Sequence, residues 1–457
     1  MLRVIGNDQN LSRQEHAVAS GTLPNGKPVV VNSDGTVSVV SETSISQSVG
    51  SPTRYDTSSV PSTSATFDSN SNKVIIAYKD STKGAAIVGT VSGTSISFGS
   101  QTVFQTGTIY EPTVTFDSNS NKVVVAYRND ENSNYGTAIV GTVSGTSISF
   151  GSKVVFNSAR TNYSSATFDS NSNKVVITYY DGGNSNYGTA IVGTVSGTDI
   201  SFGSATVFES ATAYPLSATF DSNSNKVVIA YADGGNSDHG TAVVGTVSGS
   251  SISFGTPVVF ESAEVDYVSA TFDSNSNKIV IAYRDDGNSK YGTAIVGTVS
   301  GTSISFGSPV VFDSGSSSYG SQYMTITFDS NANKVVIGYM DGANSDYGTA
   351  IVGTVSGNSI SFGSKVVFES AQSYSDPALA STFDSNSNRV VIMYRDGGAS
   401  FSPGTCVVFR NASDDSNITS ENYIGISRSG SASGAGAIID TQGAIADNLS
   451  GLTAGQS

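Results

Sequence analysis

Residues able to perform metal or nucleophilic chemistry are few in this sequence and widely separated. Cys406 is the single cysteine, so it makes no intramolecular disulfide and no thiolate metal cage. His16 lies in the N-terminal stretch, and His239 takes the place of a tyrosine in an internal repeat. Neither histidine belongs to a zinc-ligand pattern or to a Ser-His-Asp arrangement. Metal and nucleophile chemistry based on these residue types is therefore not predicted.

Carboxylates offer one hydrolytic alternative. Glu264 and Asp266 are close in sequence, and Glu111 and Asp376 also lie in variable segments. Hydrolysis of a glycoside needs two carboxylates about 5–10 Å apart, one of them with a raised pKa. Nothing in the sequence marks any two of these residues as a pair that faces one bond. Solvated surface charge is the preferred interpretation, and the chain is predicted not to be an enzyme.

A recurring turn, Asp-x-Asn-x-Asn, resembles the start of a calcium loop. Asp169, Asn171 and Asn173 form one copy, and alternate side-chain oxygens of this kind can face one cation. The turn offers one carboxylate and lacks the later bidentate glutamate, so a hydrogen-bonded hairpin explains it better. The sequence predicts no cofactor, with calcium at these turns as the weaker alternative.

Composition excludes several partners. The chain has 457 residues, with 22 Lys+Arg against 37 Asp+Glu and a net charge of −15. Binding to nucleic acid relies on clustered lysine and arginine, which this sequence lacks. No window approaches the roughly 20 apolar residues of a membrane span, and the N-terminus has no apolar run long enough for a signal peptide. We expect no nucleic-acid partner and no membrane insertion.

The segment ATFDSNSNKVVIAY recurs seven times with small changes and defines a repeat of about 52 residues. The first six copies continue with a polar loop, a TAIVGTV-like run, a short turn such as SGT, a SISFGS-like run and a PVVF-like run, whereas the seventh runs to GTCVVFR and then loses the pattern. The apolar runs predict strands buried on both faces, whereas the alternating SISF predicts an outer strand with one wet face. The phenylalanine of the seven copies is Phe67, Phe116, Phe168, Phe220, Phe272, Phe328 and Phe383.

Seven units of four antiparallel strands are typical of a seven-bladed β-propeller, because one blade is too small to bury both of its faces. Ser48–Pro52 resembles the SFGSP of the repeats, and Val49 precedes Phe67 by the separation that Phe150 keeps from Phe168. A strand at about residues 44–55 is therefore predicted to complete the seventh unit, as one strand added to three. Alternatively, Gly35–Val40 takes the third-strand place. The predicted domains are an attachment arm and hairpin (1–43), the propeller (44–410), and a Gly/Ser/Ala-rich extension or small β module (411–457).

Length variation among the seven copies is confined to one face of the predicted propeller, and most sequence variation occurs there too. The turns after the first and third strands are nearly constant, whereas the loops after the second and fourth strands differ in length and sequence. Those loops carry tyrosine and arginine, which are favoured contact residues on rigid scaffolds. Drift of unconstrained surface loops is the alternative explanation. The candidate ligand-binding residues are Tyr110, Tyr163, Tyr214, Tyr267, Tyr319, Tyr374, Arg128, Arg284 and Arg395.

The repeat array, its entry through SGTLPNGKPVVVNSDGTVSVV and its C-terminal ENYIGISRSGSASGAGAIIDTQG resemble the tail-fibre and tail-associated proteins of marine, cyanophage-like bacteriophages. The resemblance covers about residues 20–457. It implies a virion protein exposed at the tail, outside the cell, in contact with the host or with other tail proteins, and fibres of this kind are commonly homotrimers. Such tails would be expected to continue beyond LTAGQS, so the resemblance also suggests truncation or processing.

The leading hypothesis is a non-enzymatic phage tail propeller that attaches to a host-surface glycan or protein through its variable, tyrosine-bearing face. Tyrosine would supply stacking and hydrogen bonds, and the three arginines would meet acidic groups. A structural tail or baseplate module that contacts other virion proteins is the alternative. A polysaccharide-degrading enzyme and a bacterial surface adhesin are less favoured.

Overall fold

The computed structural model describes residues 14–40, 42–315, 320–372, 379–416, 423–427 and 430–440. The predicted all-β class is confirmed, since these residues form antiparallel sheets almost throughout. No helix among them is long and apolar enough to cross a membrane. The helical elements of these ranges are short 3₁₀ turns: η1 (Asp130–Asn132), η2 (Gly234–Asn236), η3 (Asp286–Asn288) and η4 (Gly342–Asn344).

The chain divides into two compact units. The larger unit spans residues 48–411, and the smaller one combines residues 1–47 with residues 412–457. In the smaller unit the N-terminal and C-terminal segments share one sheet, with strand order β1-β39-β38-β2-β3. These strands are β1 (Gln14–Val18), β2 (Pro28–Val31), β3 (Val37–Val39), β38 (Tyr423–Ser427) and β39 (Gly436–Asp440); β4 (Glu42–Ile45) pairs with β37 (Ser413–Ser416).

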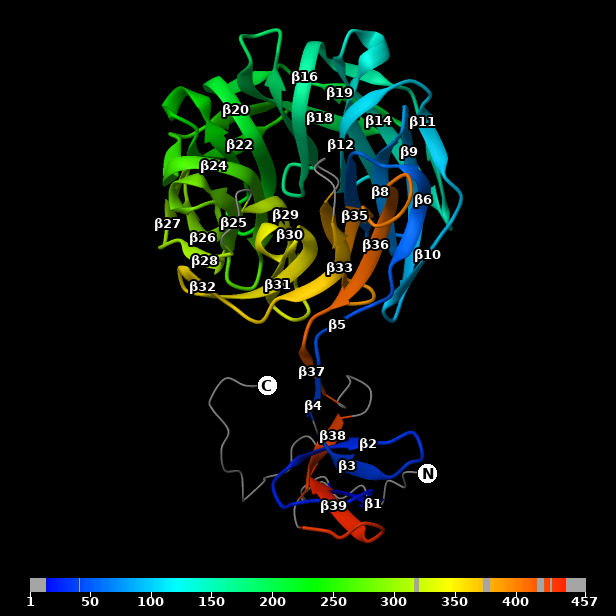
Figure 1. The fold of residues 1–457 in the computed structure, drawn as a ribbon. Helices are drawn as coiled ribbons and strands as arrows, with labels where there is room; N and C mark the ends of the chain where they lie inside the picture. Colours follow the sequence, from blue (N-terminus) through cyan, green and yellow to red (C-terminus); the bar gives the residue numbers. More distant parts are fainter. Residues whose placement is uncertain are drawn as a thin grey trace. The chain divides into compact units, whose positions relative to one another are not determined.

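Each copy of the repeat forms one antiparallel sheet of the larger unit, which we call a repeat sheet and number from one to seven (Figure 1). The first strands are β7 (Thr63–Asp68), β12 (Ile109–Asp117), the second halves of β16 (Val154–Asp169), β20 (Thr206–Asp221) and β24 (Val258–Asp273), then β29 (Ser321–Asp329) and β34 (Ala380–Asp384). The second strands are β8 (Lys73–Asp80), β13 (Lys122–Asn129), β17 (Lys174–Asp181), β21 (Lys226–Asp233), β25 (Lys278–Asp285), β30 (Lys334–Asp341) and β35 (Arg389–Arg395). The third strands are β9 (Lys83–Ser92), β14 (Tyr135–Ser144), β18 (Tyr187–Ser196), β22 (His239–Ser248), β26 (Tyr291–Ser300), β31 (Tyr347–Ser356) and β36 (Pro403–Arg410).

The predicted fourth strand is present in two pieces, both of which pair with the third strand. The short first pieces are β10 (Ser95–Phe98), β15 (Ser147–Phe150), β19 (Asp199–Phe202), β23 (Ser251–Phe254), β27 (Ser303–Phe306), β32 (Ser359–Phe362) and β5 (Ser48–Val49). The second pieces are β11 (Thr102–Gln105), the first halves of β16, β20 and β24, β28 (Val310–Asp313), β33 (Val366–Gln372) and β6 (Thr53–Ser59). Because β16, β20 and β24 each end one sheet and begin the next, they join neighbouring sheets covalently.

Glycine follows the first piece of the fourth strand in every repeat sheet, and in six of the seven it permits a close approach to a neighbouring sheet. Gly151 follows β15, and a Cβ atom at this position would lie 2.1 Å from the carbonyl oxygen of Thr198 in the next repeat sheet. No side chain fits at that distance, so only glycine permits this approach between sheets. The corresponding residue after β5 is Gly50, whose Cβ would lie 1.8 Å from the carbonyl oxygen of Thr94 in the first sheet.

A pair of aromatic rings connects each repeat sheet to the next. Phe156 of the fourth strand packs on Tyr179 in the second strand of the following sheet, with ring centroids 5.3 Å apart. The tyrosine is fully buried, and the phenylalanine ring also lies against Gly136, where a Cβ would approach its Cε2 to 2.5 Å. The equivalent pairs, at 5.2–5.3 Å, are Phe104–Tyr127, Phe208–Tyr231, Phe260–Tyr283, Phe312–Tyr339, Phe368–Tyr394 and Tyr55–Tyr78.

Hydroxyl groups link the first strands of neighbouring sheets. The backbone N–H of Ala166 donates to Oγ1 of Thr113 over 3.1 Å, and that of Ala218 donates to Oγ of Ser165 over 3.0 Å. Equivalent bonds join Val114 to Ser64 and Ala270 to Ser217. These bonds give the first strands partners beyond their own sheet, so neighbouring sheets are held in register at their first strands.

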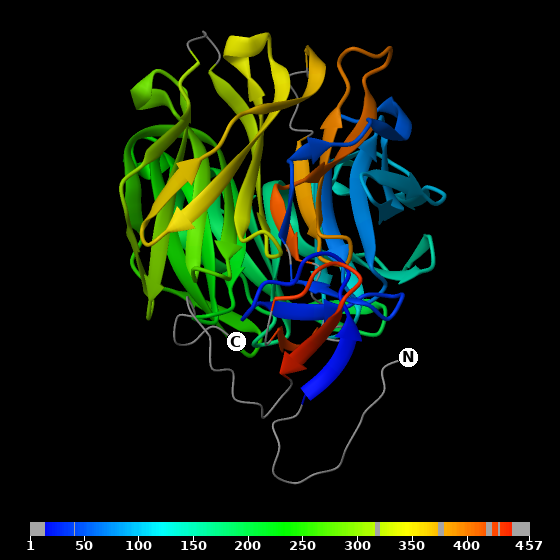
Figure 2. The ribbon, with the colours of Figure 1, turned by 90° about the horizontal axis from the view of Figure 1, so that it is seen from below.

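The N-terminal strands of the larger unit complete the seventh repeat sheet. Strands β5 and β6 both pair with β36, as the adjoining blue and orange ribbons show in Figures 1 and 2. This matches the predicted addition of one N-terminal strand to three C-terminal ones. The alternative, with Gly35–Val40 in the third-strand place, is wrong because β3 pairs with β2 in the smaller unit. The first strand β34 of this sheet packs against β7 of the first sheet.

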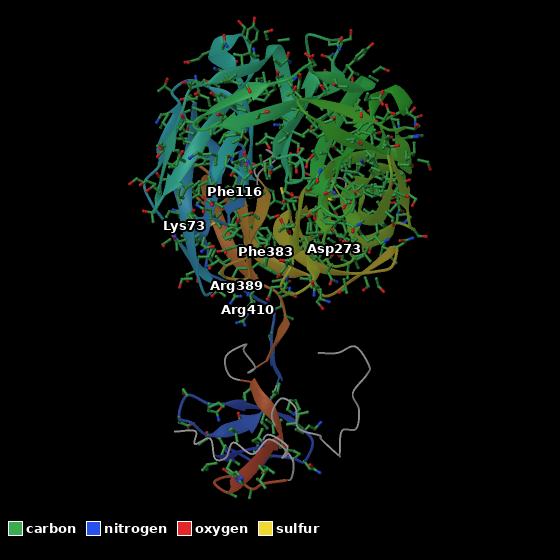
Figure 3. All side chains as sticks on the ribbon, turned by 180° about the vertical axis from the view of Figure 1, so that it is seen from behind. Lys73, Phe116, Asp273, Phe383, Arg389 and Arg410 are labelled. Atoms are coloured by element: carbon green, nitrogen blue, oxygen red, sulfur yellow. The ribbon has the colours of Figure 1, made fainter. Side chains whose placement is uncertain are left out.

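The end of the sheets that carries the nearly constant turns makes one more contact between the seventh and first sheets. Figure 3 labels Lys73, Asp273 and Arg389, which stand at the ends of strands beside these turns. Arg389 donates from Nε to the carbonyl oxygen of Gly93 over 3.0 Å, which connects β35 to the β9–β10 turn. The seventh and first repeat sheets are therefore in contact through the Tyr55–Tyr78 ring pair and this hydrogen bond.

The Tyr55 ring is expected to stabilise the larger unit as much as an internal phenylalanine does. Tyr55→Ala and Phe208→Ala should each lower the free energy of unfolding by about 3–5 kcal/mol, because each removes a buried ring between two sheets. Urea denaturation followed by circular dichroism measures the change.

The matched control is Val207→Ala, which removes a side chain that is 40% exposed on the same outer strand as Phe208. It should change the free energy of unfolding by no more than about 0.5 kcal/mol. A Tyr55→Ala variant as stable as this control would show that the N-terminal strand does not secure the seventh sheet.

Candidate ligand-binding site

An irregularity recurs where the first strands begin. The residue five positions before the repeat phenylalanine has a left-handed backbone in four sheets: φ is 50° at Glu111, 51° at Tyr163, 52° at Tyr267 and 48° at Tyr323. The register between first and second strands shifts at each of these positions, which identifies β-bulges. Pro215 holds the equivalent position in the fourth sheet and also lies in a register shift. Left-handed bulky residues are strained, and bulges redirect side chains near functional sites.

Tyr110 is held between two cations. The Nζ atom of Lys79 lies 3.8 Å from the centroid of its ring, and Cζ of Arg128 lies 4.2 Å away. Arg128 is 9% exposed and donates from Nη1 to Oδ1 of Asn162 in the third sheet. The ring is therefore fixed by cation–π contacts that involve the first and second sheets.

Tyr163 and Tyr214 form the closest aromatic pair of this region. Their ring centroids are 3.7 Å apart at an interplanar angle of 30°, and Tyr180 meets Tyr163 edge-on at 6.2 Å. The backbone N–H of Tyr163 donates to Oε2 of Glu111 from the second sheet. The pair thus joins the third and fourth sheets, with Glu111 as its connection to the second.

Tyr267 and Tyr323 continue the series into the fifth and sixth sheets. Their ring centroids are 4.8 Å apart, and Cζ of Arg284 lies 4.8 Å from the Tyr267 centroid. Arg284 forms ion pairs with Asp266, over 3.0 Å, and with Asp286, over 2.6 Å. The positive charge of Arg284 is therefore balanced within the protein.

Together these side chains form what we call the tyrosine arc: Tyr110, Tyr163, Tyr214, Tyr267 and Tyr323. Tyr214 is its most solvent-exposed member, at 40%. Burial raises the pKa of Tyr214, and the neighbouring Tyr163 and Asp266 raise it further. The hydroxyl therefore stays protonated at neutral pH and can donate a hydrogen bond to a ligand.

Two carboxyl groups beside the arc, those of Glu111 and Asp266, have raised pKa values. Burial raises the pKa of Glu111, while the hydrogen bond from Tyr163 and the charges of Arg128 and Arg160 oppose the change. Burial likewise raises the pKa of Asp266, and Arg284 opposes it. Both groups are engaged in contacts that hold arc residues in place.

The structure brings six of the nine predicted residues together. Tyr110, Tyr163, Tyr214 and Tyr267 lie in the arc, with Arg128 and Arg284 against it. Arg395 lies in a separate pocket of the seventh sheet. Tyr319 and Tyr374 lie outside the described residues.

Tyr323 and Tyr180 belong to this region but were not among the predicted residues. The signal for Tyr323 is its offset, because it precedes the repeat phenylalanine by the same five positions as Tyr163 and Tyr267. The bulge position is five residues before that phenylalanine, whereas the predicted Tyr319 is nine residues before it. Tyr180 directly follows the second-strand tyrosine, where the sequence already shows unusual diversity.

The candidate acidic groups have separate surroundings. Glu264 is exposed and lies opposite His239 in the strand register, whereas Asp266 is paired with Arg284. Asp376 lies outside the described residues. No cluster of three or more His, Cys, Asp or Glu side chains that could hold a metal occurs in the part of the chain that the structure describes.

The Asp-x-Asn-x-Asn turns are closed by hydrogen bonds to their aspartate. Oδ1 of Asp169 accepts from the backbone N–H of Asn171 over 2.9 Å and from that of Ser172 over 3.0 Å. The same pattern occurs in all seven copies, at Asp68, Asp117, Asp169, Asp221, Asp273, Asp329 and Asp384. The hairpin interpretation accounts for these contacts; calcium binding at the turns stays a prediction.

Comparison with known proteins finds solved structures of similar fold. No family model and no curated protein matches the sequence. A solved structure of a lectin from Burkholderia pseudomallei is similar to this chain with a TM-score of 0.58 and 12% identity, covering 80% of this chain and 99% of the lectin. A protein of unknown function from Dyadobacter fermentans has a TM-score of 0.45 and 9% identity, covering 81% and 99% of the two chains. At such identity the lectin's likeness concerns the fold alone.

Glu111→Gln should stabilise the protein at neutral pH. Because the pKa of Glu111 is raised in the folded state, its contribution to stability is fully present below its ordinary pKa and is lost as pH rises through the raised value. Glutamine carries no charge to desolvate and keeps an oxygen that can accept from Tyr163. We expect a higher urea midpoint than wild type at pH 7 and a difference that shrinks toward pH 4.

Glu264→Gln is the control, because Glu264 is an exposed carboxylate on the half of β24 that pairs with β22, outside the arc. Its midpoint should follow that of wild type across the same range. A Glu111→Gln variant that is less stable than wild type at pH 7 would contradict the assigned burial cost.

Proposed function

We propose that the seven repeat sheets are the blades of a seven-bladed β-propeller closed by β5 and β6. Three observations support this proposal: the first strands pack in succession from β7 to β34, β34 packs against β7, and an aromatic pair lies at all seven boundaries. The likeness to the Burkholderia lectin, at a TM-score of 0.58, is consistent with a fold of this kind.

We further propose that the protein is a non-enzymatic carbohydrate-binding protein and that the tyrosine arc contacts the glycan. The observation that carries this proposal is Tyr214, which is 40% exposed while its ring stacks on Tyr163. A pyranose ring presents a face of C–H groups, which packs well on an aromatic face, and its hydroxyls bond to groups such as the tyrosine hydroxyl. The similar fold of a lectin adds support to carbohydrate as the ligand class.

The charges around the arc favour a neutral glycan. Arg284 already pairs with two carboxylates, and Arg128 is nearly buried between Tyr110 and Asn162. In this proposal both arginines hold tyrosine rings in position. Their predicted contact with acidic groups of a ligand would require these internal pairs to be exchanged for ligand contacts.

Tyr214→Ala should weaken binding to the glycan that wild type binds best on a neutral glycan array by at least about 10-fold, because it removes the exposed ring of the arc. Tyr214→Phe keeps that ring and should retain binding within about 3-fold. Isothermal titration of the full chain provides the dissociation constants.

The control for this experiment is Val259→Ala, which removes another exposed apolar side chain, 44% exposed on β24. Its affinity should equal that of wild type, and no new reducing ends should form during incubation with the glycan. Unchanged affinity in Tyr214→Ala would remove the arc as the binding site, and released reducing ends would reveal an enzyme.

The place of the protein in a phage tail is a proposal that rests on the sequence resemblance. Antibodies against the chain should label the tails of virions that carry this gene, as seen by immunogold electron microscopy. Labelling that occurs only after the tail is disassembled would favour the alternative role as a structural tail module. Absence of the chain from purified virions would contradict both roles.

A further inference from the structure

A pocket of about 510 Å³ lies where the seventh repeat sheet meets the first. Its wall combines the end of β6, the β8–β9 turn and the β35–β36 loop. Four serines, Ser58, Ser59, Ser81 and Ser402, contribute hydroxyls, and Arg395 and Phe401 provide a cation and an aromatic ring. The volume falls within the range of about 300–1,000 Å³ that is typical of small-molecule sites. This pocket uses none of the residues of the tyrosine arc.

Phe401 is unusual for a residue at the edge of a pocket. Its side chain is 82% exposed, and its backbone is left-handed with φ of 68°. The next residue, Ser402, is also left-handed, with φ of 48°. A bulky residue in this conformation is strained, and an aromatic ring left in water gains no packing within the chain. The strain at Phe401 and the exposure of its ring are offset only if the ring packs on a molecule outside the chain.

The seventh sheet departs from the repeat beside this pocket. In the second, third, fourth and sixth sheets the third strand begins with an aromatic residue opposite the outer strand: Tyr135 opposite Arg160, Tyr187 opposite Thr212, His239 opposite Glu264 and Tyr347 opposite Gln372. The seventh sheet has Pro403 opposite Ser59. The shorter proline side chain leaves room beside Ser59, and the aromatic residue of this loop is instead Phe401.

Polar groups inside the pocket have defined positions. Arg395 donates from Nη2 to Oγ of Ser59 over 3.4 Å, which connects β35 to β6. The backbone N–H of Val60 donates to the carbonyl oxygen of Ser402 over 3.4 Å, so the loop is also tied to the end of β6. The lining combines hydroxyls and a guanidinium with an aromatic ring, and these are groups that bind the two kinds of surface that a pyranose presents.

We infer that this pocket is a second carbohydrate subsite, in which Phe401 packs on the C–H face of a terminal pyranose and the serines and Arg395 bind its hydroxyls. The inference rests on the carbohydrate recognition proposed above. A neutral sugar is the expected ligand, because the net charge of −15 disfavours the approach of acidic glycans.

The stoichiometry of sugar binding tests this inference. The full chain is titrated by calorimetry with the smallest neutral oligosaccharide that wild type binds on the array. Wild type should bind two sugars per chain, whereas Phe401→Ala and Tyr214→Ala should each bind one. Phe401→Trp, which keeps an aromatic ring, should again bind two, and Val259→Ala serves as the control with two.

The two single variants separate this subsite from the arc. A Phe401→Ala chain that still binds two sugars would overturn the pocket as a subsite and leave the arc proposal standing. If Tyr214→Ala still binds two sugars per chain while Phe401→Ala binds fewer, the pocket is supported as a sugar site and the arc is excluded as one. Binding of acidic glycans alone by wild type would overturn the subsite as a neutral-sugar site. Because Phe401 is so exposed, its replacement should leave the unfolding midpoint unchanged.

Discussion

The aromatic contact between neighbouring repeat sheets is the interaction on which the rest of the larger unit depends. A single repeat sheet has two apolar faces and cannot bury either alone, so its stability comes from the sheets beside it. The ring from one sheet occupies the space above a glycine of its own third strand and packs on a buried tyrosine of the next, as Phe156 does between Gly136 and Tyr179. Larger residues at the glycine would push the ring out, so the spacing between sheets is set at this contact. Tyr55 makes the same contact with Tyr78 from an N-terminal strand.

This contact leaves the two ends of the sheets under different constraints. At one end, the aspartate turns are closed by their own hydrogen bonds, and their sequences vary little among the copies. At the other end, the first strands begin with bulges that turn Tyr163, Tyr267 and Tyr323 out of the regular pleat. Rigid packing below the bulges supplies the energy that holds strained residues in place. The scaffold therefore presents aromatic rings at a fixed end without needing flexible loops.

Sequence periodicity predicted the parts of this structure that are repeated. The strands, the all-β class and the match of Val49 to Phe150 follow from patterns of apolar residues, because each pattern reflects burial that recurs in every sheet. The break in the fourth strand was not predicted, and neither was the approach of its glycine to a carbonyl of the next sheet, which occurs in six of the seven sheets. The tyrosine arc was predicted in part: Tyr163 and Tyr267 were found, but Tyr323 was not, because a left-handed position has no signature in residue type. Ion pairs such as that of Arg284 with Asp286 join positions whose spacing alone does not reveal contact.

The seventh sheet shows how a repeat array can acquire a feature that its copies lack. Its outer strand comes from the N-terminal side of the chain, so the residues next to its β35–β36 loop are Ser58 and Ser59 instead of those that a tandem copy would supply. The third strand here lacks the aromatic residue that begins it in the second to sixth sheets, and the loop before it has Phe401 at the surface. Packing between sheets constrains neither the origin of the outer strand nor the sequence of the β35–β36 loop. The core contact is kept, because the Tyr55 ring lies against Gly404 and packs on Tyr78. The boundary that joins the two ends of the array is therefore the place where the surface can diverge from the repeat at little cost to the core.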